Sequence, residues 1–154
     1  MNCCDFSYNG KYFVAAGGDK SVYVYDEQTR GLVTELNMAG IRNGGHQSKI
    51  TAVKFDEEDE NVMYTGSWDR TIKIYDVRQK GPVATINDGT LMMGCDALDV
   101  NGDNILCSNH TADKQLSIVS ISQRRKIVDI EWEESKFLAE GAGYLFGAKF
   151  STDG

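Results

Sequence analysis

Two segments of this chain carry side chains that could take part in chemistry, and each also has a structural interpretation. Gly17-Gly18-Asp19-Lys20-Ser21 is similar in composition to a phosphate loop, but it lacks the Gly-x-x-x-x-Gly-Lys-Ser/Thr spacing with which backbone amides surround a phosphate. His110 has no Ser or Cys nucleophile motif beside it, so we interpret it as a loop histidine rather than a general base. The sequence therefore predicts no catalytic residue, and we expect no enzyme activity.

The four cysteines do not have the spacing of a metal site. They are Cys3, Cys4, Cys95 and Cys107, and no pair is separated as Cys-x-x-Cys. Cys3 and Cys4 are adjacent and point to opposite faces of a strand, so they would not form an ordinary disulfide. The set is typical of reduced, small apolar residues. We expect no metal and no cofactor, and an intracellular, cytoplasmic protein, with the nucleus as an alternative.

The elements that must position these residues recur along the chain. Residues 62–76 (VMYTGSWDRTIKIYD) have a looser copy at residues 12–26 (YFVAAGGDKSVYVYD) in the same phase. Each copy predicts two short strands, rich in Val, Ile, Tyr and Thr, that are joined at a Gly/Ser-x-Asp turn. Units of this kind cannot bury their own apolar face and therefore stack on their neighbours.

The repeat has a defined register. Phe6, Phe55, Val100 and Phe150 each follow an alternating apolar and polar run, at intervals slightly above the roughly 40–45 residues of a four-stranded unit. We expect units at about residues 1–45, 46–88 and 89–140, with part of a fourth at 141–154. In the second unit the pattern predicts strands at residues 49–55, 61–66, 71–75 and 83–86.

These units resemble the WD-repeat family of β-propellers. In the second unit, Gly45-His46 opens the repeat, Ser67-Trp68-Asp69 lies at the turn and Ile74-Tyr75-Asp76 ends the third strand. The resemblance implies an all-β fold of about three four-stranded blades plus the start of a fourth. Propellers have four to eight blades, so we expect a fragment of a larger ring of about seven. The remaining blades would come from the rest of a longer chain or, alternatively, from a second copy.

The resemblance also implies a structural hydrogen-bond set within the second unit. In the family, a His before the first strand, the turn Asp, a Ser or Thr on the second strand and a third-strand Trp are bonded to one another. The matching residues here are His46, Asp69, Thr65 or Ser67, and Tyr75, which stands where Trp is usual. Because a buried His and Asp must be paired, His46 is interpreted as structural rather than catalytic.

Recognition is expected on the loop face that holds the turn between the second and third strands. Trp68 is the leading candidate, because Trp and Arg are enriched at binding hot spots; the alternative is that it covers a neighbouring loop. Met92 and Met93 are either an adaptable contact surface or core filling. The other residues that we expect to bind partners are Arg42, Gln47, Lys49, Arg70 and His110.

Composition limits the partners. A net charge of −7 and a pI near 4.8 disfavour nucleic-acid binding, and the chain has no apolar run long enough to cross a membrane. The first hypothesis is a non-enzymatic scaffold for proteins or peptides. The second is a substrate receptor of a cullin-type ubiquitin ligase, because Tyr75-Asp76-Val77-Arg78 is similar to an adaptor-binding box in which Asp76 and Arg78 would dock. The third hypothesis is a propeller hydrolase or lyase, and no residue in the sequence supports it.

Overall fold

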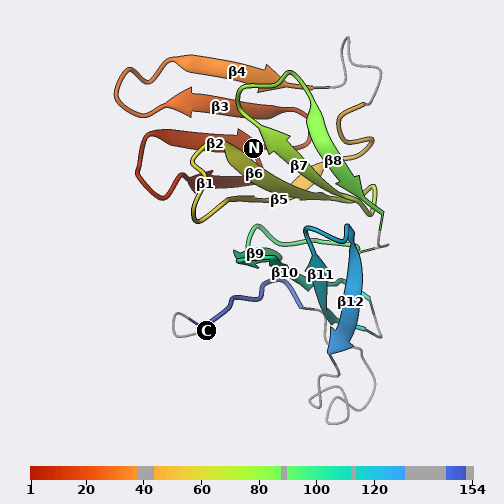
Figure 1. The fold of residues 1–154 in the computed structure, drawn as a ribbon. Helices are drawn as coiled ribbons and strands as arrows, with labels where there is room; N and C mark the ends of the chain where they lie inside the picture. Colours follow the sequence, from red (N-terminus) through yellow and green to blue (C-terminus); the bar gives the residue numbers. More distant parts are fainter. Residues whose placement is uncertain (38–43, 88–89, 112–113, 131–144, 152–154) are drawn as a thin grey trace.

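The computed structural model describes residues 1–37, 44–87, 90–111, 114–130 and 145–151 (Figure 1). Within these ranges the chain forms twelve strands and no helix, in three four-stranded antiparallel sheets. Sheet 1 consists of β1 (Cys3–Phe6), β2 (Tyr12–Ala16), β3 (Val22–Asp26) and β4 (Leu32–Leu36). Sheet 2 consists of β5 (Ile50–Phe55), β6 (Val62–Ser67), β7 (Ile72–Asp76) and β8 (Pro82–Ile86). Sheet 3 consists of β9 (Leu98–Asn101), β10 (Asn104–Ser108), β11 (Leu116–Ser120) and β12 (Arg125–Ile130). The predicted all-β class is confirmed.

Each sheet is built from strands that pair in chain order. Gly10 and Gly102 take positive φ angles of 72° and 54° in the β1–β2 and β9–β10 turns, a conformation that favours glycine. The pairing of the third and fourth strands shifts register at equivalent places in all three sheets, after Val24, Ile74 and Ile118. This shared irregularity shows that the three units are the same structural repeat, as the sequence predicts.

The first strands of the sheets lie together. Strands β1 and β2 contact β5, and β5 contacts β9. The sheets extend outwards from these strands, so that β4, β8 and β12 form the opposite edges (Figure 1). This is the arrangement of blades in a β-propeller. The described residues 145–151 lie beside β9, where the amide of Ala148 donates to the carbonyl of Asp96 at 2.9 Å.

Sheet 2 buries both of its faces, one against each neighbouring sheet. The core between sheets 1 and 2 includes Val14, Val24, Leu36, Ile50, Phe55, Met63 and Tyr75. The core between sheets 2 and 3 includes Tyr64, Ile72, Ile74, Ile86, Met92, Ile105 and Val119. Alternation along the strands of sheet 2 sends neighbouring side chains, such as Met63 and Tyr64, to opposite cores.

The face of sheet 1 that is turned away from sheet 2 presents a row of aromatic side chains. Phe6 packs on Phe13, with ring centroids 5.7 Å apart, and Phe13 stacks on Tyr25 at 4.9 Å. Phe6 is 59% exposed, whereas Phe55, at the equivalent position of sheet 2, is 2% exposed because sheet 1 covers it. Equivalent positions of the two units therefore carry the same apolar residue, whether or not a neighbouring sheet covers it. No helix in the described ranges is long and apolar enough to cross a membrane.

Candidate functional site

The β6–β7 turn is bonded to the loop that leads into β5 at three successive positions. The amide of Trp68 donates to the carbonyl of Lys49 at 3.1 Å, and the hydroxyl of Ser67 donates to the carbonyl of Ser48 at 3.2 Å. The amide of Gln47 donates to the Asp69 carboxylate at 2.7 Å. Because these hydrogen bonds join the two segments, their backbones are held in fixed relative positions.

Below the turn, His46 and Asp69 form a buried pair. His46 Nδ1 lies 2.8 Å from Asp69 Oδ2, and His46 Nε2 lies 2.7 Å from the hydroxyl oxygen of Thr65. The same carboxylate accepts from the amide and the hydroxyl of Thr71 at 3.0 and 2.7 Å. The His46 side chain is fully buried. The network therefore satisfies both ring nitrogens of a histidine that no water reaches.

Protonation of the pair follows from its surroundings. Burial lowers the pKa of His46 below 6.5, against the opposing effect of Asp69, so the imidazole is neutral at neutral pH. Burial would raise the pKa of Asp69, but hydrogen bonds from His46, Thr71 and Gln47 hold it well below 3.8. His46 Nδ1–H therefore donates to an ionised Asp69, while Nε2 accepts from the Thr65 hydroxyl.

Two residues of the predicted hydrogen-bond set do not contact His46 by hydrogen bonds. Ser67 instead bonds Ser48 and accepts from the amide of Asp69 at 3.2 Å. The Tyr75 ring centroid lies 6.5 Å from that of His46, and its hydroxyl is buried without a hydrogen-bond partner among the described residues. Burial raises the pKa of Tyr75. Of the two alternatives for the second strand, Thr65 is the residue that contacts His46.

The exposed side of the turn carries an aromatic side chain with one cation over its ring and a second cation two residues further along the turn. Trp68 is 36% exposed, and Lys49 Nζ lies 3.0 Å from its ring centroid. Arg70 is exposed and has a φ of 64°. Neither Lys49 nor Arg70 has a carboxylate within 4.0 Å in the described part of the chain. We call Gln47, Lys49, Trp68 and Arg70 the Trp68 platform.

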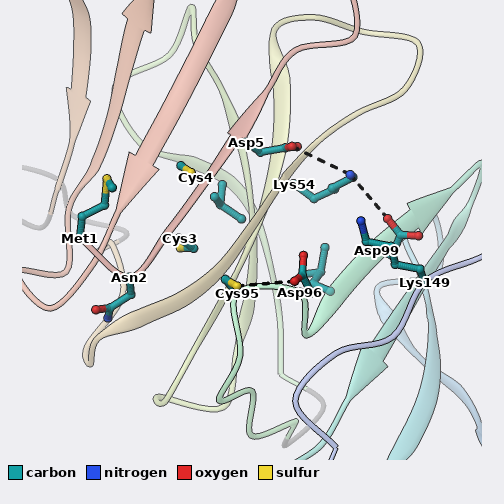
Figure 2. Close-up of a pocket in the computed structure, with 12 residues that line it drawn as sticks. Met1, Asn2, Cys3, Cys4, Asp5, Lys54, Cys95, Asp96, Asp99 and Lys149 are labelled. Atoms are coloured by element: carbon teal, nitrogen blue, oxygen red, sulfur yellow. Dashed lines mark hydrogen bonds and ion pairs between the residues drawn. The ribbon is translucent and has the colours of Figure 1, made fainter.

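A second feature, which the sequence analysis missed, lies at the inner edges of the sheets. A pocket of about 230 Å³ lies between β1, β5, β9 and residues 145–151, and Figure 2 shows Lys54 extending between Asp5 and Asp99 in it. The Lys54 ammonium lies 4.0 Å from Asp5 and 3.7 Å from Asp99. The signal was present in the sequence. The residues immediately before Phe6, Phe55, Val100 and Phe150 alternate in charge along the chain, as Asp5, Lys54, Asp99 and Lys149.

The acidic members of this series also join neighbouring units. Asp5 Oδ2 accepts from the amide of Phe55 at 2.8 Å, and Asp99 Oδ2 accepts from the amide of Phe150 at the same distance. Cys3 and Cys95 line the pocket as free thiols, and burial raises the pKa of Cys3 to about 12. A thiol with so high a pKa is a poor nucleophile. Among the described residues, no group of three or more His, Cys, Asp or Glu side chains is arranged to hold a metal ion.

Comparison with known proteins identifies the repeat. The family profile described as "WD domain, G-beta repeat" matches residues 1–26 and 41–76, which include the platform and the His46–Asp69 pair. The chain belongs to the WD-repeat family. The "Poly(A)+ RNA export protein" of Schizosaccharomyces pombe is 26% identical in an alignment of 153 residues. The alignment covers 94% of this chain and 40% of that protein.

Two further relatives match shorter stretches of these WD repeats. The "LEC14B homolog" of Prunus armeniaca is 36% identical over 64% of this chain and 20% of that protein. The "WD repeat-containing protein 1" of Gallus gallus is 32% identical over 58% of this chain and 14% of that protein. The chain thus spans less than half the length of each of these three relatives.

The remaining predicted residues of the WD repeats are distributed around the structure. His110 lies in the β10–β11 connection, where its amide donates to the carbonyl of Leu91 and its ring packs on Phe146 at 5.3 Å. Arg42 lies outside the described residues. Met92 is fully buried and packs beside Gly66, so of its two interpretations the structure supports core filling.

Asp76 and Arg78 bond each other at the end of β7. Arg78 Nε and one terminal nitrogen donate to the two Asp76 carboxylate oxygens at 2.8 and 2.7 Å, and this lowers the pKa of Asp76. The same guanidinium lies 3.7 Å from Asp59. The three relatives described above are not named as ligase subunits. Nothing in these findings favours the ligase hypothesis, and it is not carried further.

Proposed function

We propose that this chain is a non-enzymatic protein-binding scaffold that contacts partner proteins or peptides through the Trp68 platform. WD repeats are interaction modules, and the named relatives give no reason to assign catalysis. The observation that carries the proposal is an exposed Trp68 side chain on a turn that is bonded to its neighbouring loop at three positions. A rigid, exposed aromatic residue gives large contact area at a low cost in conformational entropy.

The alternative interpretation is that Trp68 only covers a neighbouring loop, and its contact with Lys49 of that loop agrees with it. That contact leaves more than a third of the Trp68 surface open, however, and an exposed cation–π pair contributes only about 0.5–1 kcal/mol to folding. We therefore propose that the surface is kept for a partner. We also propose that the protein acts inside the cell, with proteins rather than nucleic acid or membrane as partners, in keeping with its net charge of −7.

The test is capture of native partners by the wild-type chain and by Trp68→Ala, with bound proteins identified by mass spectrometry. A matched control is Tyr8→Ala, which removes another exposed aromatic side chain, 61% exposed, in the β1–β2 turn. The proposal expects Trp68→Ala to lose a partner that Tyr8→Ala retains, with both variants unfolding within about 1 kcal/mol of the wild type. Full retention of every partner by Trp68→Ala, with a large loss of stability, would show a purely structural role.

A further inference from the structure

We propose that the Trp68 platform binds an acidic peptide segment, in which an Asp or Glu carboxylate pairs with Lys49 and Arg70 while an adjacent apolar side chain packs on Trp68. The inference rests on the proposed function and adds the chemistry of the partner. It is carried by one exposed aromatic ring with Lys49 over it and Arg70 exposed in the same turn, because neither cation has a carboxylate partner in the described part of the chain.

The charges around the platform favour an anion. Asp69 is the nearest carboxylate in sequence, but its side chain is only 7% exposed and it already accepts hydrogen bonds from His46, Gln47 and Thr71. It forms no ion pair with Lys49 or Arg70, and its single negative charge offsets only one of the two positive charges. Some other surface cations are paired within the chain, as Lys11 is with Glu60 at 2.6 Å. Two unpaired cations on one turn and its neighbouring loop, together with an exposed ring, are a complementary surface for a carboxylate.

Two other carboxylates, those of Asp19 and Asp96, form no ion pair with the cations of the platform. Asp19 lies in the β2–β3 turn of sheet 1, where it accepts from the hydroxyl of Tyr23 at 3.0 Å. Asp96 lies at the inner pocket, next to β9. Neither forms an ion pair with Lys49 or Arg70. The positive charge of the platform is thus local, within a chain whose net charge is −7.

The backbone at both cations is fixed before any partner arrives. Arg70 has a φ of 64°, a region in which non-glycine residues are uncommon, and its amide donates to the carbonyl of Ser67 at 3.1 Å. Lys49 is joined to Trp68 both by its carbonyl and by its ammonium group above the ring. Because the backbone and the Lys49–Trp68 contact are set in advance, binding a partner orders chiefly the exposed Arg70 side chain.

The first unit offers a control residue that has the same charge and backbone conformation as Arg70 but no neighbouring Trp. Lys20 occupies the place of Arg70 in the first unit, is exposed, and has a φ of 68°. It has no Trp beside it, because Gly18 stands at the position of Trp68. The inference therefore predicts that Arg70 contributes to binding and that Lys20 does not.

The experiment measures binding of fluorescent peptides to the whole chain by anisotropy. The probes are a set of short peptides with one central Leu or Phe flanked by Asp and Glu, and the same peptides with Asn and Gln in those places. We expect saturable, salt-sensitive binding of acidic probes, and a weakening of about tenfold in Lys49→Gln and in Arg70→Gln. Lys20→Gln should bind as the wild type does, and thermal unfolding should be alike in all three variants.

Several outcomes would overturn the inference. Equal binding of the Asn and Gln probes would show that charge is not read, and an equal loss in Lys20→Gln would show a diffuse electrostatic effect. If a phosphoserine peptide or a single-stranded RNA oligonucleotide bound more tightly than every acidic probe, the ligand of Lys49 and Arg70 would be a phosphate group rather than a carboxylate. Native partners lost in Trp68→Ala but retained in Lys49→Gln and Arg70→Gln would refute this inference and leave the proposed function standing. No partner that depends on Trp68 would refute the proposed function itself.

Discussion

Replacing Asp69 by Ala should destabilise this chain far more than the same change at the equivalent residue of the first unit, Asp19. Asp69 accepts four hydrogen bonds, from His46 at 2.8 Å, from the amide of Gln47 at 2.7 Å, and from the amide and hydroxyl of Thr71 at 3.0 and 2.7 Å. Asp19 is exposed and accepts from Tyr23 at 3.0 Å and more weakly from the amide of Ser21 at 3.4 Å.

The magnitude follows from which donors water can reach after the change. Gln47 is exposed and Thr71 is half-buried, so their amides can bond water and lose little. The Nδ1–H of His46 is in a fully buried side chain and would be left without an acceptor. An orphaned buried donor and a lost charge-assisted bond together cost about 3 kcal/mol, whereas Asp19→Ala should cost about 0.5 kcal/mol.

The assay is urea unfolding of the two variants and the wild type. With a slope of about 2 kcal/mol per molar, Asp69→Ala should lower the midpoint by about 1.5 M, and Asp19→Ala by about 0.25 M. The slopes should not change. Similar midpoint shifts in the two variants would refute the claim that the His46–Asp69 pair stabilises the second unit.

Three further predictions concern the core and the buried histidine. Tyr75→Phe should leave the free energy of unfolding unchanged or raise it by about 1 kcal/mol, because the buried hydroxyl has no partner among the described residues; a clear loss in urea unfolding, beyond that of the control Tyr25→Phe, would contradict this. Gly66→Ala should cost about 1–3 kcal/mol, since its Cβ would overlap Met92 Sδ, and a double-mutant cycle with Met92→Ala should show strong coupling rather than additive costs. Because burial lowers the pKa of His46 in the folded state, the unfolded state binds more protons, and stability should fall as the pH drops below 6.5. His46→Gln should flatten that slope, whereas stability that rises toward acid pH would show that the charge of Asp69 outweighs burial.

The strands were predictable from the sequence because the pattern repeats. In the second unit the expected segments at residues 49–55, 61–66, 71–75 and 83–86 correspond to the observed β5–β8, with ends that differ by at most one residue. Alternation and β-branched residues determine where a strand can form, and the polar turns determine where it stops. The third unit lacks the Trp-Asp turn, yet Leu98 and Ile105 still form its core, since apolar periodicity alone is sufficient to form the sheet.

The candidate site was predictable only in part. The turn motif pointed to Trp68, Lys49 and Arg70, but a motif cannot show that Lys49 lies over the Trp68 ring, because that depends on the bonds between two loops. The sequence also could not show whether the Tyr75 hydroxyl has a hydrogen-bond partner. A hydrogen bond depends on the distance and angle between two atoms in the folded chain, and residue type does not determine these. The inner pocket was missed because its charged residues lie in different units and meet only when the sheets stack.

The alternation of Asp5, Lys54, Asp99 and Lys149 along the inner strands restricts how such an array can evolve. A single repeat duplicated into the series would set two carboxylates or two ammonium groups next to each other at the new junction, and like charges that close repel. A duplicated pair of repeats would preserve every opposite-charge neighbour. Gene duplication in this lineage should therefore be tolerated more readily in steps of two repeats than in steps of one.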